Sequence, residues 1–452
     1  MALRDDIDEA NALLDLGRAK DASTPDARGG DKRVTTVAER RRAFTVLFIS
    51  LTCMGAGQTV LFNILPPLSR QLGLSTIETT GIFSISALLW VFTSAYWGAR
   101  SDHWGRKPVM LMGLIAFALS FALFATVILA GLNHWLPVIA VFPLLIVTRS
   151  VYGLLGSGTA PASQAYVADR TTSQERLSGV ATIGSAFGVG TVVGPGIASV
   201  FAVVGLLAPF YFIVLLALAS AGAIWLLLPE RTPPRRRERV TWSLKWHDRR
   251  ILPFVLFAIG LSLANTVPIQ TMGFFFIDVL KIKPEVAAQF ILVGQMATSM
   301  SALFAQLVVV QRFPFSARQL TNWGLAAAFV SFLFFLLAHQ FGPLVFALAL
   351  SGLGFGMARP GFVSGASLAV APHEQGAVAG IIGGASATGF IFGPVIGWMY
   401  ERSPFVPYWF GGILVVVLFA SMFFSRTLRH AGDIPPEPEA AEEAAETPLA
   451  NG

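Results

Sequence analysis

The sequence has few charged side chains and almost no cysteine, and both shortages limit what the chain can be. Charged residues make up 13% of its 452 residues and hydrophobic residues 54%, whereas soluble domains carry about 25% charged residues. So few charges cannot cover a water-soluble surface, so most of the chain must face lipid or other apolar helices. The single cysteine, Cys53, excludes an intrachain disulfide and a cysteine metal site.

Other absences exclude whole classes of chemistry. The six histidines never form an H-x-x-x-H pattern, and the sequence contains no Walker motif for binding ATP. We therefore expect no metal, no cofactor and no enzymatic activity. The net charge of +6 would suit a nucleic-acid partner, but in a membrane protein it indicates basic cytoplasmic loops instead. No nucleic-acid partner is expected.

Long apolar runs dominate what is present. Each is near or above the roughly 20 residues that cross ~30 Å of hydrocarbon. They are continuous rather than alternating, which favours helices over a membrane barrel. The sequence thus predicts an all-α polytopic membrane protein with twelve transmembrane helices. The runs are 43–65, 79–99, 109–131, 138–165, 178–203, 207–228, 251–277, 286–310, 317–338, 343–369, 376–399 and 405–425.

The positions of the basic residues predict the topology. Arg40, Arg41 and Arg42 precede the first run, and the loop 229–250 is rich in Arg and Lys. Because basic loops stay in the cytoplasm, we expect an integral protein of the plasma membrane (the inner membrane in bacteria) with both termini cytoplasmic. The predicted parts are a largely disordered tail 1–42, a six-helix bundle 43–228, a basic linker 229–250, a second bundle 251–425 and an acidic disordered tail 426–452.

The two predicted bundles repeat one another. Three residues of the fifth run recur 199 residues later in the eleventh: Gly190, Gly194 and Pro195 become Gly389, Gly393 and Pro394. Glycines permit close helix packing and proline softens a helix, so we interpret these six residues as helix pivots. An offset of six helices keeps both halves in the same orientation. Two pseudo-symmetric bundles facing one another predict a central cavity between them.

A short loop carries the most specific motif. Between the second and third runs stands Gly98-Ala99-Arg100-Ser101-Asp102-His103-Trp104-Gly105-Arg106-Lys107. This resembles the loop signature G-x-x-x-D-x-x-G-R-K/R of the major facilitator superfamily, and the resemblance covers nearly the whole membrane region. It implies the major facilitator fold and a conformational switch loop made of Gly98, Asp102, Gly105, Arg106 and Lys107.

Two further patterns narrow the resemblance. Arg149 and Gly153 in the fourth run, and Gly190, Gly194 and Pro195 in the fifth, are similar to motifs of the twelve-helix drug:proton antiporters, the tetracycline-efflux branch included. The resemblance implies a secondary active transporter that works by alternating access and exports small amphipathic or drug-like compounds. Its expected partners are a small-molecule substrate and the lipid bilayer, with protons left open as the coupling ion. We expect it to act as a monomer.

Polar residues inside the runs predict the substrate cavity, because such groups are costly in a membrane. At an offset of 207 residues, Gln58 corresponds to Asn265 and Asn63 to Gln270. Arg149 and Arg359 are the charges well inside apolar runs. We predict that these six residues line the cavity. The alternative for all of them is hydrogen bonding between helices without contact to a ligand.

The middle of every run lacks Asp and Glu, so proton coupling would need a peripheral group. The candidates are Glu78, Asp102, Asp169, Glu175, Asp278, Glu374 and His339. Two other functions stay open at this point. A carrier for a specific, anionic metabolite is favoured if Arg149 and Arg359 both reach the cavity. A non-transporting membrane receptor or scaffold would keep the helices without needing two symmetric pivots.

Overall fold

A computed structural model describes residues 37–171, 173–202, 204–229, 248, 250–337, 339–370, 375–425 and 428. Within these residues, the regular elements are helices. The predicted tails and the basic linker therefore lie almost wholly outside the described residues. Residues 37–42 are an exception, and they correct the prediction: they do not belong to a tail but form the first turns of a helix.

The helices of the N-terminal half match the first six predicted runs and extend most of them at their ends. They are α2 (Val37–Gln71), α3 (Thr76–Trp104), α4 (Arg106–Leu132), α5 (Val138–Leu155), η1 (Gly156–Gly158), α6 (Thr159–Ala168), α7 (Ser173–Ala202) and α8 (Ala208–Leu227). A 3₁₀ turn, η1, joins α5 and α6 into one span.

The helices of the C-terminal half match the other six predicted runs. They are α9 (Leu252–Asp278), α10 (Pro284–Phe304), η2 (Ala305–Val309), α11 (Val310–Arg312), α12 (Ala317–Leu337), α13 (Phe341–Leu368), α14 (Gln375–Ile391), α15 (Gly393–Arg402) and α16 (Val406–Phe424). Here η2 is a π-helical turn between α10 and α11.

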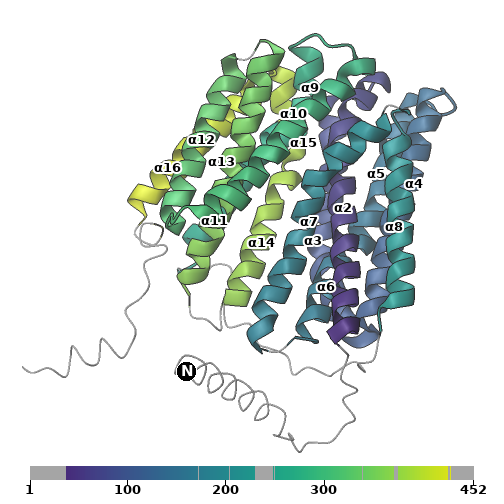
Figure 1. Ribbon diagram of the computed structural model, residues 1–452. Coiled ribbons are helices and arrows are strands. Elements are labelled where there is room, and N and C mark those ends of the chain that lie inside the picture. The colour runs from purple at the N-terminus through teal and green to yellow at the C-terminus, as the bar shows by residue number, and fades with distance from the viewer. Residues whose placement is uncertain are drawn as a thin grey trace, which may run out of the picture. The chain divides into compact units, whose positions relative to one another are not determined.

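Eleven spans among the described residues are long and apolar enough to cross a membrane. The remaining predicted run, 178–203, corresponds to α7, whose apolar stretch Thr182–Ala198 is shorter. The all-helical membrane fold predicted from the sequence is confirmed. Figure 1 shows the helices running side by side along a common direction.

Local sequence explains where several helices begin. Ser75 caps α3: its side chain accepts from the Glu78 N–H, and the Glu78 carboxylate accepts from the Ser75 N–H. Gly105 separates α3 from α4 with φ = +100°, a conformation that glycine adopts without strain. Proline stands in the first turn of α8, α9, α10, α15 and α16, where its missing N–H costs nothing.

Each half buries its own apolar core. One core collects residues between Ala43 and Leu228, joined by Leu292, and the other collects residues between Ile251 and Leu428. Between the halves, α3 packs against α14 and α15, and α7 packs against α10. Two separate cores joined along two helix crossings allow each half to move as a unit.

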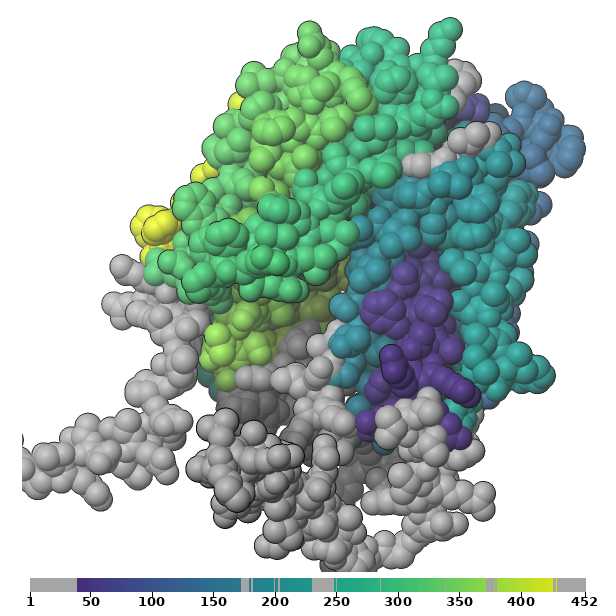
Figure 2. All heavy atoms as spheres, in the orientation of Figure 1, coloured from purple at the N-terminus to yellow at the C-terminus, as the bar shows by residue number. Residues whose placement is uncertain are grey.

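The contacts between the halves cluster at one end of the helices, which we name the closed end. It lies near residues 62–84 of the N-terminal half and 270–278 and 390–401 of the C-terminal half. Figure 2 shows the two halves meeting in the upper part of the view, with a recess opening between them lower down. We name that other end the recess end.

Candidate functional site

An ion pair joins the two halves at the closed end. The Arg70 guanidinium, at the end of α2, lies 2.7 Å from the Asp278 carboxylate at the end of α9. Tyr400 of α15 donates its hydroxyl to the same carboxylate oxygen at 3.2 Å. Arg70 also donates to Thr76 at 3.2 Å and stacks 4.7 Å above the Phe274 ring. Both charged side chains are about a quarter exposed, so the pair is partly desolvated and stronger than a surface pair.

A proline-freed carbonyl forms the next contact toward the middle of the helices. Pro394 has no N–H, so the carbonyl oxygen of Phe390, four residues earlier, loses its helical donor. Ser84 of α3 donates its hydroxyl to this oxygen at 2.7 Å. The Phe390 ring stacks on Phe62 of α2, with centroids 5.4 Å apart. The break between α14 and α15 thus supplies a hydrogen-bond acceptor to the opposite half.

Glycines let the helices approach at the same end. A Cβ atom on Gly397 would lie 2.5 Å from the Thr80 hydroxyl and 3.0 Å from the Cα of Ile77. A Cβ on Gly393 would lie 2.5 Å from the Ser84 hydroxyl. The Ile77 N–H donates to Glu401 at 3.0 Å. The α3–α15 crossing is therefore closed by backbone contact and excludes side chains larger than glycine.

Toward the recess end, the face of α14 that carries Phe390 no longer contacts the opposite half. Gly383 precedes Phe390 by seven residues, which is about two helical turns, so both lie on one face. A Cβ added at Gly380, Gly383 or Gly384 would meet nothing within 4 Å in the described part of the chain. Gly188 of α7 is equally open. The helices that touch at the closed end are separated along the recess.

The two predicted pivots differ in structure. Around Pro195, α7 continues as one helix, whereas the equivalent Pro394 interrupts the helix between α14 and α15. Pro195 frees the Thr191 carbonyl, to which Thr59 of the same half donates at 3.2 Å. The carbonyl freed by Pro394 is bound by the opposite half instead. One pivot is tied inside its own half and the other across the interface.

The glycines of the pivots are packing positions. A Cβ atom on Gly190 would lie 2.0 Å from the Thr52 carbonyl oxygen, and one on Gly194 would lie 2.7 Å from that of Ala56. In the other half, a Cβ on Gly389 would lie 2.5 Å from the Ser262 carbonyl oxygen. Glycine is therefore needed where α7 meets α2 and where α14 meets α9. Their role as pivots stays a prediction.

Two of the six predicted cavity residues bind one another. Gln58 accepts a hydrogen bond of 2.6 Å from the Arg149 guanidinium. Arg149 is 1% exposed and lies between the rings of Phe121 and Tyr152, at 5.5 and 4.9 Å. Gln58 is partly exposed and stands one turn from Phe62, whose ring meets the opposite half. Gln58 therefore separates a buried cation from the interface between the halves.

The other four occupy three different environments. Asn63 and Gln270 are buried at the closed end, and neither amide has a hydrogen-bond partner among the described residues. Asn265 is half-buried and Arg359 is exposed. Buried amides without partners are costly, and opening of the closed end would give them water. That all six line one cavity stays a prediction.

The loop between α3 and α4 forms a network of polar contacts. Arg106 pairs with Asp102, lies 3.2 Å from the Asp169 carboxylate and donates to Ser101 at 2.5 Å. Lys107 donates to the carbonyls of Trp225 and Leu228 at 2.7 and 2.9 Å and so caps the end of α8. A cation holding carbonyls at a helix end is a favourable arrangement.

Gly98 is the first glycine of the loop motif and faces Pro161. A Cβ atom there would lie 3.5 Å from the Cβ of Pro161, which is an ordinary contact. The glycine is therefore not required by space in this conformation, whereas the φ of Gly105 does favour glycine.

Because two carboxylates share Arg106, removing one should cost little and removing both should cost much more. We expect Asp102→Asn to lower the free energy of unfolding by about 1 kcal/mol, since Arg106 keeps Asp169. The double variant Asp102→Asn with Asp169→Asn leaves the mostly buried cation unpaired and should cost about 3 kcal/mol. Thermal unfolding of the purified protein and its single and double variants measures this. Additive losses would show that the two acids do not share Arg106.

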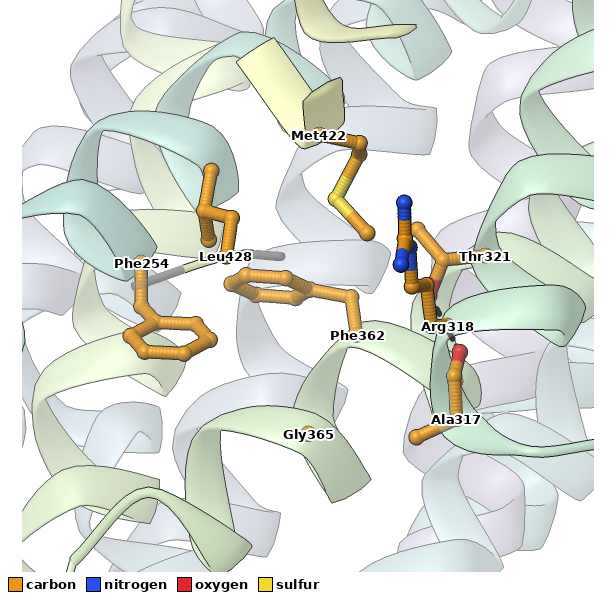
Figure 3. Close-up of a pocket in the computed structure, with 9 residues that line it drawn as sticks. Phe254, Ala317, Arg318, Thr321, Phe362, Gly365, Met422 and Leu428 are labelled. Carbon is orange, nitrogen blue, oxygen red and sulfur yellow. Dashed lines mark hydrogen bonds between the residues drawn. The ribbon is translucent and has the colours of Figure 1, made fainter. Parts of the chain in front are cut away.

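A small pocket lies away from the interface. Figure 3 shows it inside the C-terminal half, between Phe254 of α9, Arg318 and Thr321 of α12, Phe362 of α13 and Met422 of α16. Its volume of about 10 Å³ matches a single water molecule. This pocket is too small for a drug-sized compound.

Sequence reasoning missed most of the closed end. Asp278 was a candidate only for proton coupling, and Arg70, Tyr400 and Ser84 were not singled out. One signal was available for the ion pair. Arg70 and Asp278 follow the first and seventh runs, on the side where the other loops carry few charges.

The comparison with known proteins identifies the family. The family model described as Major Facilitator Superfamily matches residues 47–394. "Multidrug resistance protein 2" of Bacillus subtilis (strain 168) is 26% identical over 399 residues, which cover 84% of this chain and 94% of the relative. "Tetracycline resistance protein, class B" of Escherichia coli is 24% identical over 411 residues, which cover 84% of this chain and 95% of the relative.

Solved structures support the fold. The nucleoside transporter NupG superimposes with a TM-score of 0.64 at 15% identity, over 85% of this chain and 99% of that chain. A bacterial homologue of the human lysosomal transporter Spinster, in an inward-facing and occupied conformation, has a TM-score of 0.60 at 14% identity, over 88% and 94%. At these identities the likeness concerns the fold alone.

Proposed function

The chain belongs to the major facilitator superfamily, and from this premise we propose that it exports small amphipathic or drug-like compounds by alternating access. Membership makes it an integral membrane transport protein for small molecules rather than an enzyme. The names of its relatives support drugs as the substrates, since they are resistance proteins for multiple drugs and for tetracycline.

One observation carries the mechanism. The halves touch at the closed end through the Arg70–Asp278 pair and the α3–α15 crossing, while a recess separates them at the other end. A transporter that opens to one side at a time needs such a one-sided seal. Rocking of the two halves, each built around its own core, would open the closed end and close the recess.

The proposal includes an orientation. The recess end carries the start of α2, which includes Arg40, Arg41 and Arg42, and the end of α8, which precedes the basic linker 229–250 in the sequence. The positive-inside rule assigns this end to the cytoplasm. The structure then corresponds to an inward-open state, sealed toward the outside. A single chain supplies both halves, which supports the monomer as the working unit.

Transport by inside-out vesicles tests the export function. Vesicles containing the protein should accumulate ethidium or tetracycline, without ATP, when a pH gradient (acidic inside) is imposed. Accumulation without a gradient would remove protons as the coupling ion and keep the export function. If no compound of a broad panel moves faster than in empty vesicles, the export function is wrong.

Reversing a charge at the closed end should open it. In Asp278→Arg, two cations would face one another where an ion pair now stands, so we expect the outward-open state to gain at least about tenfold in population, or about 1.4 kcal/mol. Spin labels at His134→Cys and Gln340→Cys, in exposed loops of the two halves at this end, should move apart.

The charge swap provides the control. Arg70→Asp combined with Asp278→Arg restores an ion pair and should restore the shorter label distance. An unchanged distance in the single variant would show that the pair does not hold the closed end. Cys53 is buried, and Cys53→Ser leaves the two labels as the sole reporters.

A further inference from the structure

The buried cation at Arg149 has unused hydrogen-bonding capacity. Its Nη2 atom donates to Gln58, whereas Nε and Nη1 have no hydrogen-bond partner among the described residues. Phe121 and Tyr152 cover its faces. A guanidinium buried to this extent is normally paired with a carboxylate, because an unpaired buried charge is strongly unfavourable. Arg149 therefore has donors left over that an anionic oxygen could accept from.

The described residues offer no such oxygen near Arg149. In the described spans, each Asp or Glu stands in the first or last turn of its helix, far along the membrane from Arg149. These residues are Glu39, Glu78, Asp102, Glu175, Asp278, Glu285 and Glu401. The middle of the N-terminal half therefore carries a positive potential that its own carboxylates do not cancel.

Gln58 is the point of entry for a ligand. Its side-chain oxygen sits 2.6 Å from Arg149 Nη2, which is where an acidic oxygen of a ligand would bind. Gln58 is partly exposed, and Phe62, one turn away on the same face of α2, stacks on Phe390 of the opposite half. A ligand between the halves would thus meet aromatic rings beside Gln58. Rotation of this one side chain would expose the guanidinium, which binds carboxylates in a bidentate manner.

We propose that the recess selects flat aromatic compounds that carry a carboxylate or similar acidic group, with Arg149 binding the acid, Gln58 shielding Arg149 until the ligand arrives, and the Phe62–Phe390 pair lying beside the rings. This inference rests on the proposed export function and gives its substrate class. It separates this chain from an exporter of lipophilic cations, which would need a carboxylate in the same place.

Two dyes that differ only at the acid provide the test. Rhodamine B carries a free carboxylate, and its ethyl ester has the same rings without one. The purified full-length protein should bind rhodamine B about tenfold more tightly than the ester, as expected for hydrogen bonds to a charged group. Fluorescence polarisation measures both dissociation constants, and proteoliposomes measure transport of both dyes.

Three variants at the site sharpen the result. Gln58→Glu supplies Arg149 with a carboxylate, so the fold is retained while the acid preference should vanish and the cationic ester should become the better ligand. Arg149→Lys keeps the charge but loses the two-point geometry, so part of the preference should remain. Arg149→Gln should abolish the preference, and if that variant does not fold, Gln58→Glu alone decides.

The outcomes separate the two proposals. Equal binding of both dyes, tighter binding of the ester, or an unchanged ratio in Gln58→Glu would overturn the acid site and leave export intact. If neither dye binds while ethidium is still transported, the acid site is also wrong. If neither dye nor any compound of the broad panel is transported, the export function fails together with it.

Discussion

A leucine at Gly190 should prevent the N-terminal half from folding. Any Cβ at this position would lie 2.0 Å from the Thr52 carbonyl oxygen and 2.7 Å from the Ala56 nitrogen, both of which belong to the backbone of α2. Backbone atoms cannot rotate away as a side chain can, so α7 would have to move off α2. Overpacking of a core typically costs about 1–3 kcal/mol, and contact with backbone places this case at or above the upper end.

The measurement is the yield of monodisperse protein and its thermal unfolding midpoint. Gly188→Leu is the matched control, since it places the same residue on the same helix where a Cβ meets nothing within 4 Å in the described part of the chain. The control should accumulate normally and unfold near the wild-type temperature. Equal yields of the two variants would mean that the α2–α7 contact is looser than this structure has it.

A leucine at Gly397 should hold the closed end open while leaving both halves folded. The clash here lies between the halves, against Thr80 and Ile77 of α3, so separation of the halves relieves it without damage to either core. We expect the ratio of inward-open to outward-open protein to fall about tenfold, since an overpacking energy of about 1–3 kcal/mol brackets the roughly 1.4 kcal/mol that shifts an equilibrium tenfold. Transport should fall in proportion.

Spin labels at positions 134 and 340 report this shift as a longer distance. Gly384→Leu is the control, because it adds the same side chain to the same span on the side of the recess, where space is open. Its label distance should equal that of the wild type. A Gly397→Leu protein with wild-type distance and wild-type transport would refute the closed-end contact as the seal.

The spans and the short loop were predictable because their signals are local. Twenty apolar residues demand a helix in lipid whatever surrounds them, and Gly105 must allow the turn between α3 and α4 whatever the state of the protein. The repeat of Gly190 at Gly389 likewise identified two glycines that pack against α2 and α9. These features depend on neighbours that stay in place.

The closed end was not predictable in the same way. Arg70 and Asp278 lie far apart in the sequence, and their pairing depends on which end of the molecule is shut. Asn63 and Gln270 were singled out as polar residues within apolar runs, but hydropathy does not reveal that this conformation buries both. The same sequence must fit two conformations, so local sequence patterns do not reveal the contacts that form in only one of them.

The two proline-freed carbonyls have donors in different halves of the molecule. This difference predicts on which side the halves separate and about which side they rotate. The carbonyl of Thr191 is held by Thr59 within its own half, so rocking of the halves does not disturb it. The carbonyl of Phe390 accepts from Ser84 across the interface. It therefore loses this donor, and must accept from water instead, each time the contact between α3 and α15 opens. Opening should therefore start along α3 and α15 and swing about the α7–α10 crossing, which would make the entrance a slot along one side of the molecule rather than a symmetric funnel.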